Sequence, residues 1–451
     1  MARERPGEDA VIFVSVVKWT ALALCVGLIT GASTWLLVWT LDRGAAEAER
    51  WWNYYFLLMP AGLLASGLII KYLAPRAAGH GAAGVIDAIH RRSGRIRPIQ
   101  VPVEFARTFL TIVSGGSAGK EGPSAQIGAG LASIFADGLR LNDGDRRKAV
   151  ICGVSGGFAS VFGTPIAGAV FGMECLFVGS MRYDALLPSF VTGVVSYQVS
   201  SWLGLTYLRR TLGFAPAFSG VFFMKILFAG VCFGVVSIIF IETLAALSRI
   251  SGRLAPQVYA KAALGGAALV GIAFLSGGTS LGLGVDVIRA ALEGSFVFPS
   301  VFLWKSLATA VTLGFGGHGG IGTPIFFVGA ASGSALSPFI GLDTALLSSI
   351  GFVALLAGAA NTPIAASIMA AELFGPGIAP YAAVACVISY VISGHRSAYP
   401  TQRIDVAKSP SLEVERGAAV EGQRPVYVER QGSLIRVVSA AVEFFRKGKG
   451  R

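Results

Sequence analysis

Charged residues are scarce in this chain. They make up 14% of its 451 residues, whereas soluble globular proteins carry about 25%. Hydrophobic residues reach 54%, and the mean hydropathy is +0.67. This balance excludes a disordered chain and a cytosolic enzyme. It predicts an integral membrane protein with room for roughly ten or more spans of about 20 residues each.

Paired cysteines and a signal peptide are also missing. The five cysteines lie in apolar stretches and no two form a C-x-x-C pair, so we expect buried, reduced thiols and neither a disulfide nor a zinc site. The first apolar run, residues 11–41, is too long for the core of a signal peptide. The net charge of +12, in a chain this apolar, indicates loops facing an anionic cytoplasmic leaflet and excludes a nucleic-acid partner.

The apolar runs after residue 73 are interrupted by glycine and proline. The interruptions fall at residues 115–116, 119–123, 163–165, 277–284 and 314–324. Lipid cannot satisfy the backbone groups that a broken helix exposes, so such breaks must face protein or a watery cavity. Broken helices in corresponding places of two halves indicate a transporter's binding site.

The chain contains an internal duplication. The spacing G-x-x-x-P-x-x-x-x-G-A begins at Gly119 and recurs at Gly320, an offset of 201 residues. The sequence T-P-I-A, with a glutamate ten residues after its threonine, begins at Thr164 and recurs at Thr362, an offset of 198. A G-x-G pair at residues 79–81 recurs at 282–284. We therefore predict four segments: a cytoplasmic N-terminus (1–10), two membrane repeats (11–212 and 213–402) and a basic cytoplasmic tail (403–451).

Residues 119–123, G-K-E-G-P, place a carboxylate where a helix is predicted to begin. An acid inside an apolar region is a functional candidate by default. The free N–H groups and the positive dipole end of a helix start attract an anion, so the Glu121 carboxylate can compete with a mobile ion for that place. The alternative is that Lys120 and Glu121 only neutralise each other.

Two further helix starts carry no acid. Residues 320–324, G-I-G-T-P, are the equivalent element of the second half, and residues 79–81 precede a helical pattern over 85–90. Their backbone N–H groups are expected to hold an anion without a full positive side chain. Several such ends that converge on one point permit release as well as binding, which conduction requires.

These motifs resemble those of the CLC family of chloride channels and chloride/proton exchangers. Residues 119–123 match G-[KR]-E-G-P, 320–324 resemble G-x-F-x-P, 162–168 resemble F-N-x-P-x-A-G, and 79–84 resemble a degenerate G-S-G-I-P-E. Tyr399 lies where the family's last membrane helix offers a hydroxyl to the central anion. The resemblance runs from about residue 11 to 402 in the family's motif order. About 49 residues follow, too few for the family's optional cytoplasmic CBS pair, so no CBS domain is expected.

The resemblance implies an all-α polytopic fold of two inverted-topology repeats, built from broken and tilted helices, and a homodimer with one anion pathway in each subunit. Carried over residue by residue, Glu121 is the gating glutamate. The implied anion-binding positions are Gly79, His80, Ile321, Gly322 and Tyr399. Glu121 and Glu174 are the candidates for a proton path.

Several positions depart from the family pattern. The signature serine is His80, and the phenylalanine of G-x-F-x-P is Gly322. The inner proton-transfer glutamate falls on Cys175, and a buried thiol is a poor proton carrier at neutral pH. Glu174 precedes that position by one residue. Because Glu174 and Glu372 occupy equivalent repeat positions, a shared structural role is favoured over a proton path.

A further departure is Glu104, which stands seventeen residues before Glu121 where the family often has a lysine. Arg107, one helical turn away, is its expected partner. His318 is expected in a glycine-rich loop without a catalytic role.

Two other functions are alternatives to CLC-type transport. Residues 153–156, G-V-S-G, match a serine nucleophile pattern, so an intramembrane serine protease using Ser155 is one alternative. A sodium-coupled or other secondary organic-anion transporter, which uses the same broken-helix logic, is the other.

We expect CLC-type transport of chloride or a related small anion, either as a chloride/proton antiporter or as a voltage-gated-type channel. No enzyme activity, cofactor or metal is expected. The protein should be a multi-pass plasma (inner) membrane protein with both termini cytoplasmic.

Overall fold

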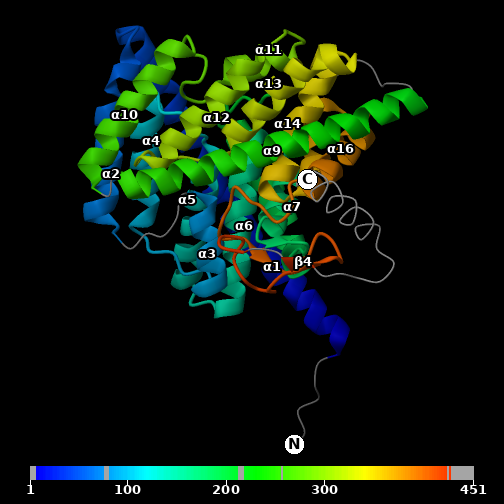
Figure 1. Cartoon of the computed structure of the whole chain (residues 1–451). Coiled ribbons are helices and arrows are strands. Elements are labelled where there is room, and N and C mark those ends of the chain that lie inside the picture. Colours follow the sequence, from blue (N-terminus) through cyan, green and yellow to red (C-terminus); the bar gives the residue numbers. More distant parts are fainter. Residues whose placement is uncertain (1–6, 76–80, 212–217, 255–256, 424–425, 428–451) are drawn as a thin grey trace, which may run out of the picture.

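The computed structural model describes residues 7–75, 81–211, 218–254, 257–423 and 426–427, and it is almost entirely helical (Figure 1). The first half contains α1 (Glu8–Trp51), η1 (Tyr55–Leu58), α2 (Met59–Leu73), α3 (Ala82–Arg91), α4 (Gln100–Val113), α5 (Glu121–Gly138), α6 (Asp143–Phe162), α7 (Pro165–Glu174), η2 (Tyr183–Ala185) and α8 (Leu186–Trp202). The second contains α9 (Gly220–Leu254), α10 (Val258–Leu275), α11 (Val285–Leu292), α12 (Pro299–Gly314), α13 (Gly322–Ile340), α14 (Thr344–Ala360), α15 (Pro363–Phe374) and α16 (Ala379–Ile392). Four two-residue strands are β1 (Phe177–Val178), β2 (Arg403–Ile404), β3 (Leu412–Glu413) and β4 (Val426–Tyr427).

The helices break where the sequence motifs predicted. Helix α6 ends at Gly163, whose φ of +69° is a left-handed conformation, and Pro165 starts α7. In the second half, α14 ends at Asn361 with φ +57° and Pro363 starts α15. A left-handed residue stops a helix, and a proline suits the first turn of the next one. The repeated T-P-I-A sequence is therefore the start of a short helix in each half.

Contacts between the halves are reciprocal. Gly119 and Gly320, which are repeat equivalents, exchange two backbone hydrogen bonds of 2.7 Å each. The N–H of Ser117 donates to Thr312 Oγ1 at 3.0 Å, and the N–H of His318 donates to Thr111 Oγ1 at 2.9 Å. Such contacts, made twice with the partners exchanged, are what a two-fold axis produces. The halves are thus repeats related by a two-fold axis, and they meet where α5 and α13 begin; the predicted division at residues 212 and 213 lies outside the described residues.

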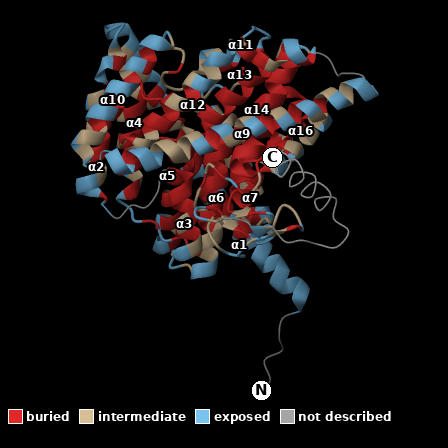
Figure 2. Ribbon diagram, in the orientation of Figure 1, coloured by how far each residue is buried: buried red, intermediate tan, exposed pale blue. Residues whose placement is uncertain are grey.

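The buried core consists of the central helices of both halves (Figure 2). Helix α14 is buried along its whole length, and it packs against α13 as α6 packs against α5. These pairs need glycine: a Cβ on Gly153 would lie 2.5 Å from the Gly128 oxygen, and one on Gly351 would lie 2.4 Å from the Gly329 oxygen. Without side chains, the backbones approach closely, as in other membrane helix pairs.

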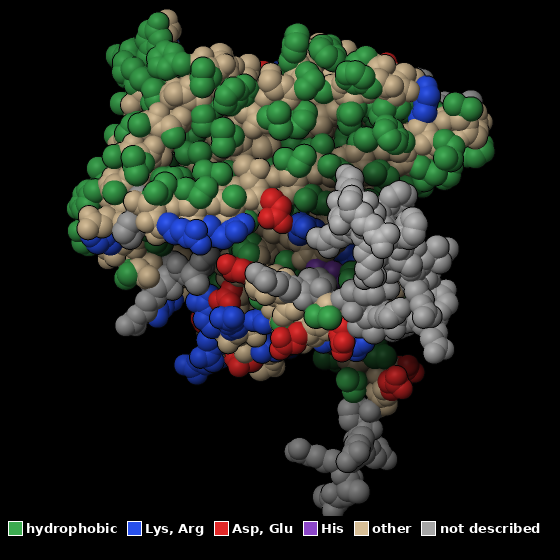
Figure 3. Space-filling view, in the orientation of Figure 1, with side chains coloured by type: hydrophobic (Ala, Val, Ile, Leu, Met, Phe, Trp, Pro, Cys, Tyr) green, Lys and Arg blue, Asp and Glu red, His purple; other side chains and the backbone are tan. Residues whose placement is uncertain are grey.

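The peripheral helices present apolar side chains outward. In the described chain, five helical stretches are long and apolar enough to cross a membrane: residues 8–51, 55–73, 220–254, 258–275 and 322–340. Figure 3 shows hydrophobic side chains over the upper part of one face, while Lys, Arg, Asp and Glu gather in its lower part. Lipid is the solvent that suits such an apolar belt, so the chain is a multi-pass integral membrane protein.

The residues that follow the last helix dock onto the helical body. The Gln402 side chain donates to the carbonyl oxygens of Cys175 (2.8 Å) and Ala360 (2.7 Å). Strand β2 then pairs in parallel with β1. Composition predicted only a basic tail here, so this ordered docking of residues 403–423 is a feature that the sequence did not reveal.

Candidate functional site

Glu121 lies at the junction of the two repeats. It is the first residue of α5, as predicted, and it is 3% exposed. Its carboxylate accepts a hydrogen bond of 2.8 Å from the backbone N–H of Thr323 and another from the Thr323 hydroxyl. Because Thr323 is in the first turn of α13, a carboxylate of one half caps the helix of the other.

Lys120 does not neutralise this carboxylate by direct contact. Its ammonium lies 3.7 Å from a carboxylate oxygen of Asp42. The alternative that Lys120 and Glu121 form a simple ion pair is therefore wrong. The nearest partners of the Glu121 oxygens are the N–H and hydroxyl donors of α13, which are also donors that a small anion would use.

Glycines make room for this arrangement. A Cβ on Gly122 would lie 2.8 Å from the Cα of Gly320, and one on Gly320 would lie 2.6 Å from the nitrogen of Gly122. A Cβ on Gly322 would lie 3.0 Å from Glu121 Oε2. The glycine that stands in place of the family's phenylalanine thus leaves space for the Glu121 carboxylate.

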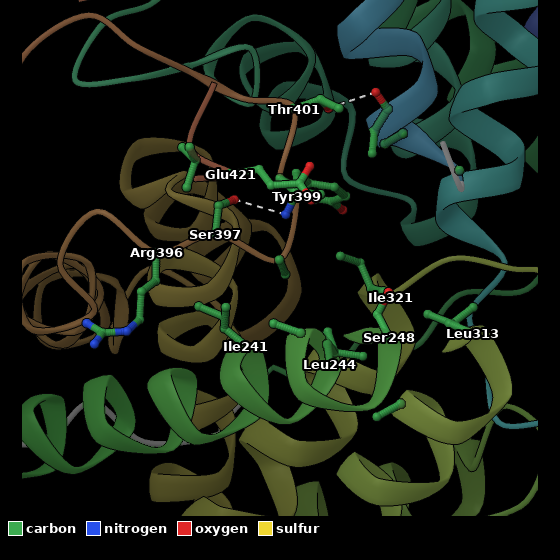
Figure 4. A pocket seen from close by; sticks show the side chains of 18 of the residues that line it. Ile241, Leu244, Ser248, Leu313, Ile321, Arg396, Ser397, Tyr399, Thr401 and Glu421 are labelled. Carbon is green, nitrogen blue, oxygen red and sulfur yellow. Dashed lines mark hydrogen bonds between the residues drawn. The ribbon is translucent and has the colours of Figure 1, made fainter. Parts of the chain in front are cut away.

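Two cavities approach the junction. The tail-side cavity, with a volume of about 670 Å³, is lined by Gly122, Ile321 and Tyr399 and by Glu421 of the docked tail (Figure 4). The Glu121-side cavity, of about 510 Å³, is lined by Glu121 and Thr323. The two cavities share no lining residue, although Glu121 and Gly122 are adjacent in the chain. The Glu121–Thr323 contact therefore lies at the boundary between them.

The structure places two of the five predicted anion-binding positions around one cavity. Ile321 and Tyr399 line the tail-side cavity, and their side chains lie on opposite sides of it in Figure 4. Tyr399 lies in the loop after α16, where its backbone N–H donates to Ser397 Oγ at 2.9 Å. Gly79 and His80 lie outside the described residues. The next residue, Gly81, lines the tail-side cavity.

Glu174 and Glu372 form a reciprocal clasp between the repeats. The Glu174 carboxylate accepts from the N–H groups of Ile364 (3.0 Å) and Ala365 (2.8 Å) at the start of α15. The Glu372 carboxylate accepts from Ile166 (3.0 Å) and Ala167 (2.9 Å) at the start of α7. Each carboxylate thus caps the helix of the other half, where the dipole favours negative charge.

Cys175 lies directly after this clasp. It is buried, and its Sγ is 3.8 Å from the carbonyl oxygen of Gly172. Its own carbonyl oxygen accepts from Gln402. All five cysteines are free thiols. Cys152, Cys175 and Cys386 are buried, but Cys25 is exposed and Cys232 is half-buried, so the prediction that all five are buried is wrong: these two lie on outward-facing sides of α1 and α9.

Glu104 makes a contact that the sequence did not predict. Its Oε2 lies 2.6 Å from His318 Nε2, and both residues are buried. Arg107, the expected partner, donates through Nε to the carbonyl oxygen of Ser66 at 3.0 Å. His318 lies in the loop between α12 and α13, as expected, and its link to Glu104 ties that loop to α4.

Ser155 has no access to a substrate. It is fully buried between α6 and α7, and its hydroxyl donates to the carbonyl oxygen of Ala169 at 3.2 Å. A Cβ on Gly172 would lie 2.2 Å from its Oγ. This packing contradicts the serine protease alternative.

Titratable groups outside the membrane-spanning helices fasten the tail beside the tail-side cavity. The Lys408 ammonium donates to Asn361 Oδ1 and to the Tyr390 carbonyl oxygen, both at 2.6 Å, and burial lowers its pKa to about 6. His395 Nε2 accepts from the backbone N–H of Lys408 at 3.0 Å. Burial lowers the pKa of His395, and the nearby Lys408 charge lowers it further.

Thr323 and Gln402 are the functional candidates that sequence reasoning missed. Thr323 had one signal, a hydroxyl within the first turn after the second-half glycine motif. Gln402 had none, because its partners at 175 and 360 are far away in sequence.

Comparison with known proteins agrees with these motifs. A model of the voltage gated chloride channel family matches residues 61–394. A chloride/fluoride channel protein of Pseudomonas syringae pv. tomato is 36% identical over 417 residues, which cover 90% of this chain and 91% of that protein. The crystal structure of a CLC-type fluoride/proton antiporter superposes with a TM-score of 0.82 at 28% identity, covering 87% of this chain and 99% of the other. A slow cyanobacterial Cl⁻/H⁺ antiporter has a TM-score of 0.73 at 21% identity, covering 83% and 94%.

Proposed function

Because this chain belongs to the voltage gated chloride channel family, known as CLC, we propose that it is a proton-coupled antiporter whose principal anion is fluoride. CLC-type anion transport is its activity, and it is not an enzyme. We propose, in addition, that transport is coupled to protons, that the anion is fluoride, and that individual residues have the roles given below.

The contact between Glu121 and Thr323 carries the proposal. An ionised Glu121 occupies the N–H and hydroxyl donors at the start of α13. When the carboxylate takes up a proton, it loses the charge that these donors favour, and a mobile anion replaces it. Proton and anion then alternate at one place, which is the basis of an exchange.

Fluoride is favoured over chloride on two grounds. A 36% identical relative is a chloride/fluoride channel protein, and a structure at 28% identity is a fluoride/proton antiporter. Fluoride is also the more strongly hydrated ion, so the donors that replace its water must be strong. A hydroxyl and a backbone N–H of one residue, Thr323, meet at the proposed site.

The proton is proposed to reach Glu121 through water in the tail-side cavity. Gly122, the neighbour of Glu121, lines that cavity. Cys175 is a buried thiol and Glu174 is engaged by two N–H groups of α15, so we assign Glu174 and Glu372 to the structural clasp. The anion pathway then includes Gly79, His80, Ile321, Gly322 and Tyr399.

The orientation follows from charge. Arg91, Arg92, Arg95 and Arg97 lie around the end of α3 and the loop that follows it, and Figure 3 shows Lys and Arg gathered in the lower part of the molecule, where α3 and the docked tail lie. By the positive-inside rule this end is cytoplasmic, which makes the tail-side cavity the inner one and the tail cytoplasmic. We also propose that the protein is a homodimer in the plasma (inner) membrane.

Flux from liposomes tests the function. Purified protein is reconstituted in vesicles with an outward fluoride gradient, and external fluoride and pH are recorded together with the membrane potential clamped. Exchange predicts that fluoride efflux drives protons inward against their gradient. Fast fluoride flux without proton movement would indicate a channel, and chloride flux that exceeds fluoride flux would refute the anion assignment.

A further inference from the structure

Lys305 is a fully buried lysine in the middle of α12. Its Nζ donates to the carbonyl oxygens of Gly282 (2.7 Å) and Ser280 (3.3 Å), and it lies 5.0 Å from the centroid of the Phe327 ring. None of the ion pairs among the described residues includes it. A buried charge without a contacting counter-ion is costly, so its retention calls for a reason beyond packing.

The internal repeat gives the first evidence that Lys305 has a role beyond packing. Lys305 follows Glu104 by 201 residues, the same offset that relates Gly119 to Gly320, so the two are repeat equivalents. Glu104 is paired with His318 in the loop that leads into α13, whereas Lys305 holds the carbonyls of the loop that leads into α11. Since the same helix forms with either residue, the fold itself does not require the positive charge.

The second piece of evidence is the position of the Lys305 ammonium. Gly284, the residue before α11, has φ +69°, and a Cβ there would lie 3.4 Å from Lys305 Nζ. The next residue, Val285, lines the Glu121-side cavity together with Glu121. The ammonium thus lies behind the wall of the cavity that contains the proposed gate.

Other charges reach this cavity, but they are exposed or half-buried. They are Asp42, Lys120, Arg209, Arg210, Arg289 and Glu293. Water and salt screen such groups, whereas a buried charge is screened much less. Among the described residues, Lys305 is the one fully buried cation beside the wall of this cavity.

We propose that Lys305 is a positioning residue of the anion pathway: its buried positive charge favours a negative group at the start of α13, either a mobile anion or the Glu121 carboxylate. The charge then sets two properties together, the anion affinity of this site and the proton concentration at which Glu121 is released. The inference rests on the proposed gating role of Glu121.

The test separates charge from hydrogen bonding. Lys305→Gln keeps donors toward the two carbonyls but removes the charge, and Lys305→Arg keeps the charge. For Lys305→Gln we expect the half-saturating fluoride concentration to rise about tenfold and the pH of half-maximal transport to rise by about one unit, the order of effect for unit charges separated by several ångströms of protein. Lys305→Arg should behave as wild type. Lys225→Met is the matched control and should change neither value: it removes a half-buried ammonium bound to the Gly341 carbonyl, and neither residue lines the Glu121-side cavity.

A Glu121→Gln background separates this inference from the function on which it rests. There Lys305→Gln should still weaken fluoride binding but should no longer move the pH profile, because the proton acceptor is gone. Equal defects in the Gln and Arg variants, or a folded Lys305→Gln protein with wild-type affinity and pH profile, would overturn the role of the charge. If Lys305→Gln does not fold, the Lys305→Arg variant decides. A pH profile that departs from wild type would overturn the role of the charge, and a pH profile that matches wild type would support it. If Glu121→Gln alone keeps normal proton coupling, the proposed function fails first.

Discussion

The clasp between Glu174 and Glu372 makes a prediction that distinguishes scaffold from proton path. Each carboxylate accepts two backbone N–H groups at the start of a helix in the other repeat, at 2.8–3.0 Å. Glu174→Gln keeps one acceptor oxygen and replaces the other with an NH₂ group that faces an N–H. One hydrogen bond is lost, a donor is left unsatisfied, and the charge at the helix start disappears.

The magnitude follows from these losses. A hydrogen bond to a charged group contributes about 1.5–3 kcal/mol, and the helix end adds about 0.3–1 kcal/mol. We expect Glu174→Gln to destabilise the fold by about 2–4 kcal/mol, which in a chain of this length corresponds to a fall in melting temperature of about 3 °C. Glu372→Gln should act similarly because its geometry is the same. The double variant should deviate from additivity, since the two carboxylates hold the same pair of helices.

Thermal unfolding in detergent, followed by tryptophan fluorescence, measures the stability, and liposome flux measures the coupling. Glu47→Gln is the matched control: Glu47 is exposed, lies 3.9 Å from Arg50 and accepts a hydrogen bond of 3.1 Å from Trp51 Nε1, and exposed contacts of this kind contribute little. The scaffold role predicts a lower melting temperature with an unchanged ratio of protons to anions. A normal melting temperature with lost proton coupling would refute it and place Glu174 on the proton path.

Three further predictions concern the junction and the tail. Thr323→Val removes the hydroxyl but keeps the N–H, so the half-saturating fluoride concentration should rise about tenfold or more, whereas Thr323→Ser should remain near wild type; equal values for both would exclude the hydroxyl. Gly320→Ala places a Cβ 2.6 Å from the Gly122 nitrogen and should cost at least about 2 kcal/mol of stability, whereas Gly271→Ala, with nothing within 4 Å of the added Cβ, should cost nothing measurable in the same melting assay. The tail should undock on acidification: the pKa of His395 is lowered in the folded state, so the contribution of His395 to docking is complete above its ordinary value of about 6.5 and is lost as the pH falls below it. Burial lowers the pKa of Lys408 from 10.5 to about 6, so its contribution to docking also falls on acidification, over the whole range between these two values. Hydrogen exchange of residues 403–423 should therefore accelerate between pH 7.5 and 5.5 beyond its intrinsic change, and less so in His395→Gln; an equal response in both proteins would exclude His395.

The sequence predicted the elements of the site because those elements are local. G-K-E-G-P puts glycines, an acid and a proline at one helix start, and α5 does begin at Glu121. The recurrence of T-P-I-A predicted equivalent helix breaks at Pro165 and Pro363, which the structure confirms. Helix starts and stops depend on neighbouring residues, so spacing alone carries the information.

The pairings of side chains were not predictable in the same way. Glu121 contacts Thr323, which is 202 residues away in sequence. Glu104 contacts His318 in a distant loop, although Arg107 is only one helical turn away. Such contacts depend on how two helices approach each other, which glycines and packing decide. The docking of Lys408 was hidden for the same reason, because its acceptors at Asn361 and Tyr390 belong to the ends of two different helices.

The central claim is that the Glu121 carboxylate and the mobile anion alternate at the start of α13. Glu121→Gln mimics the protonated carboxylate, and Glu121→Ala removes it. In liposomes with a fluoride gradient and a clamped membrane potential, both variants should move fluoride while proton movement disappears, and their flux should no longer depend on pH between about 5 and 8. Proton uptake that still accompanies fluoride efflux at the wild-type ratio, or a wild-type pH dependence in either variant, would contradict the account.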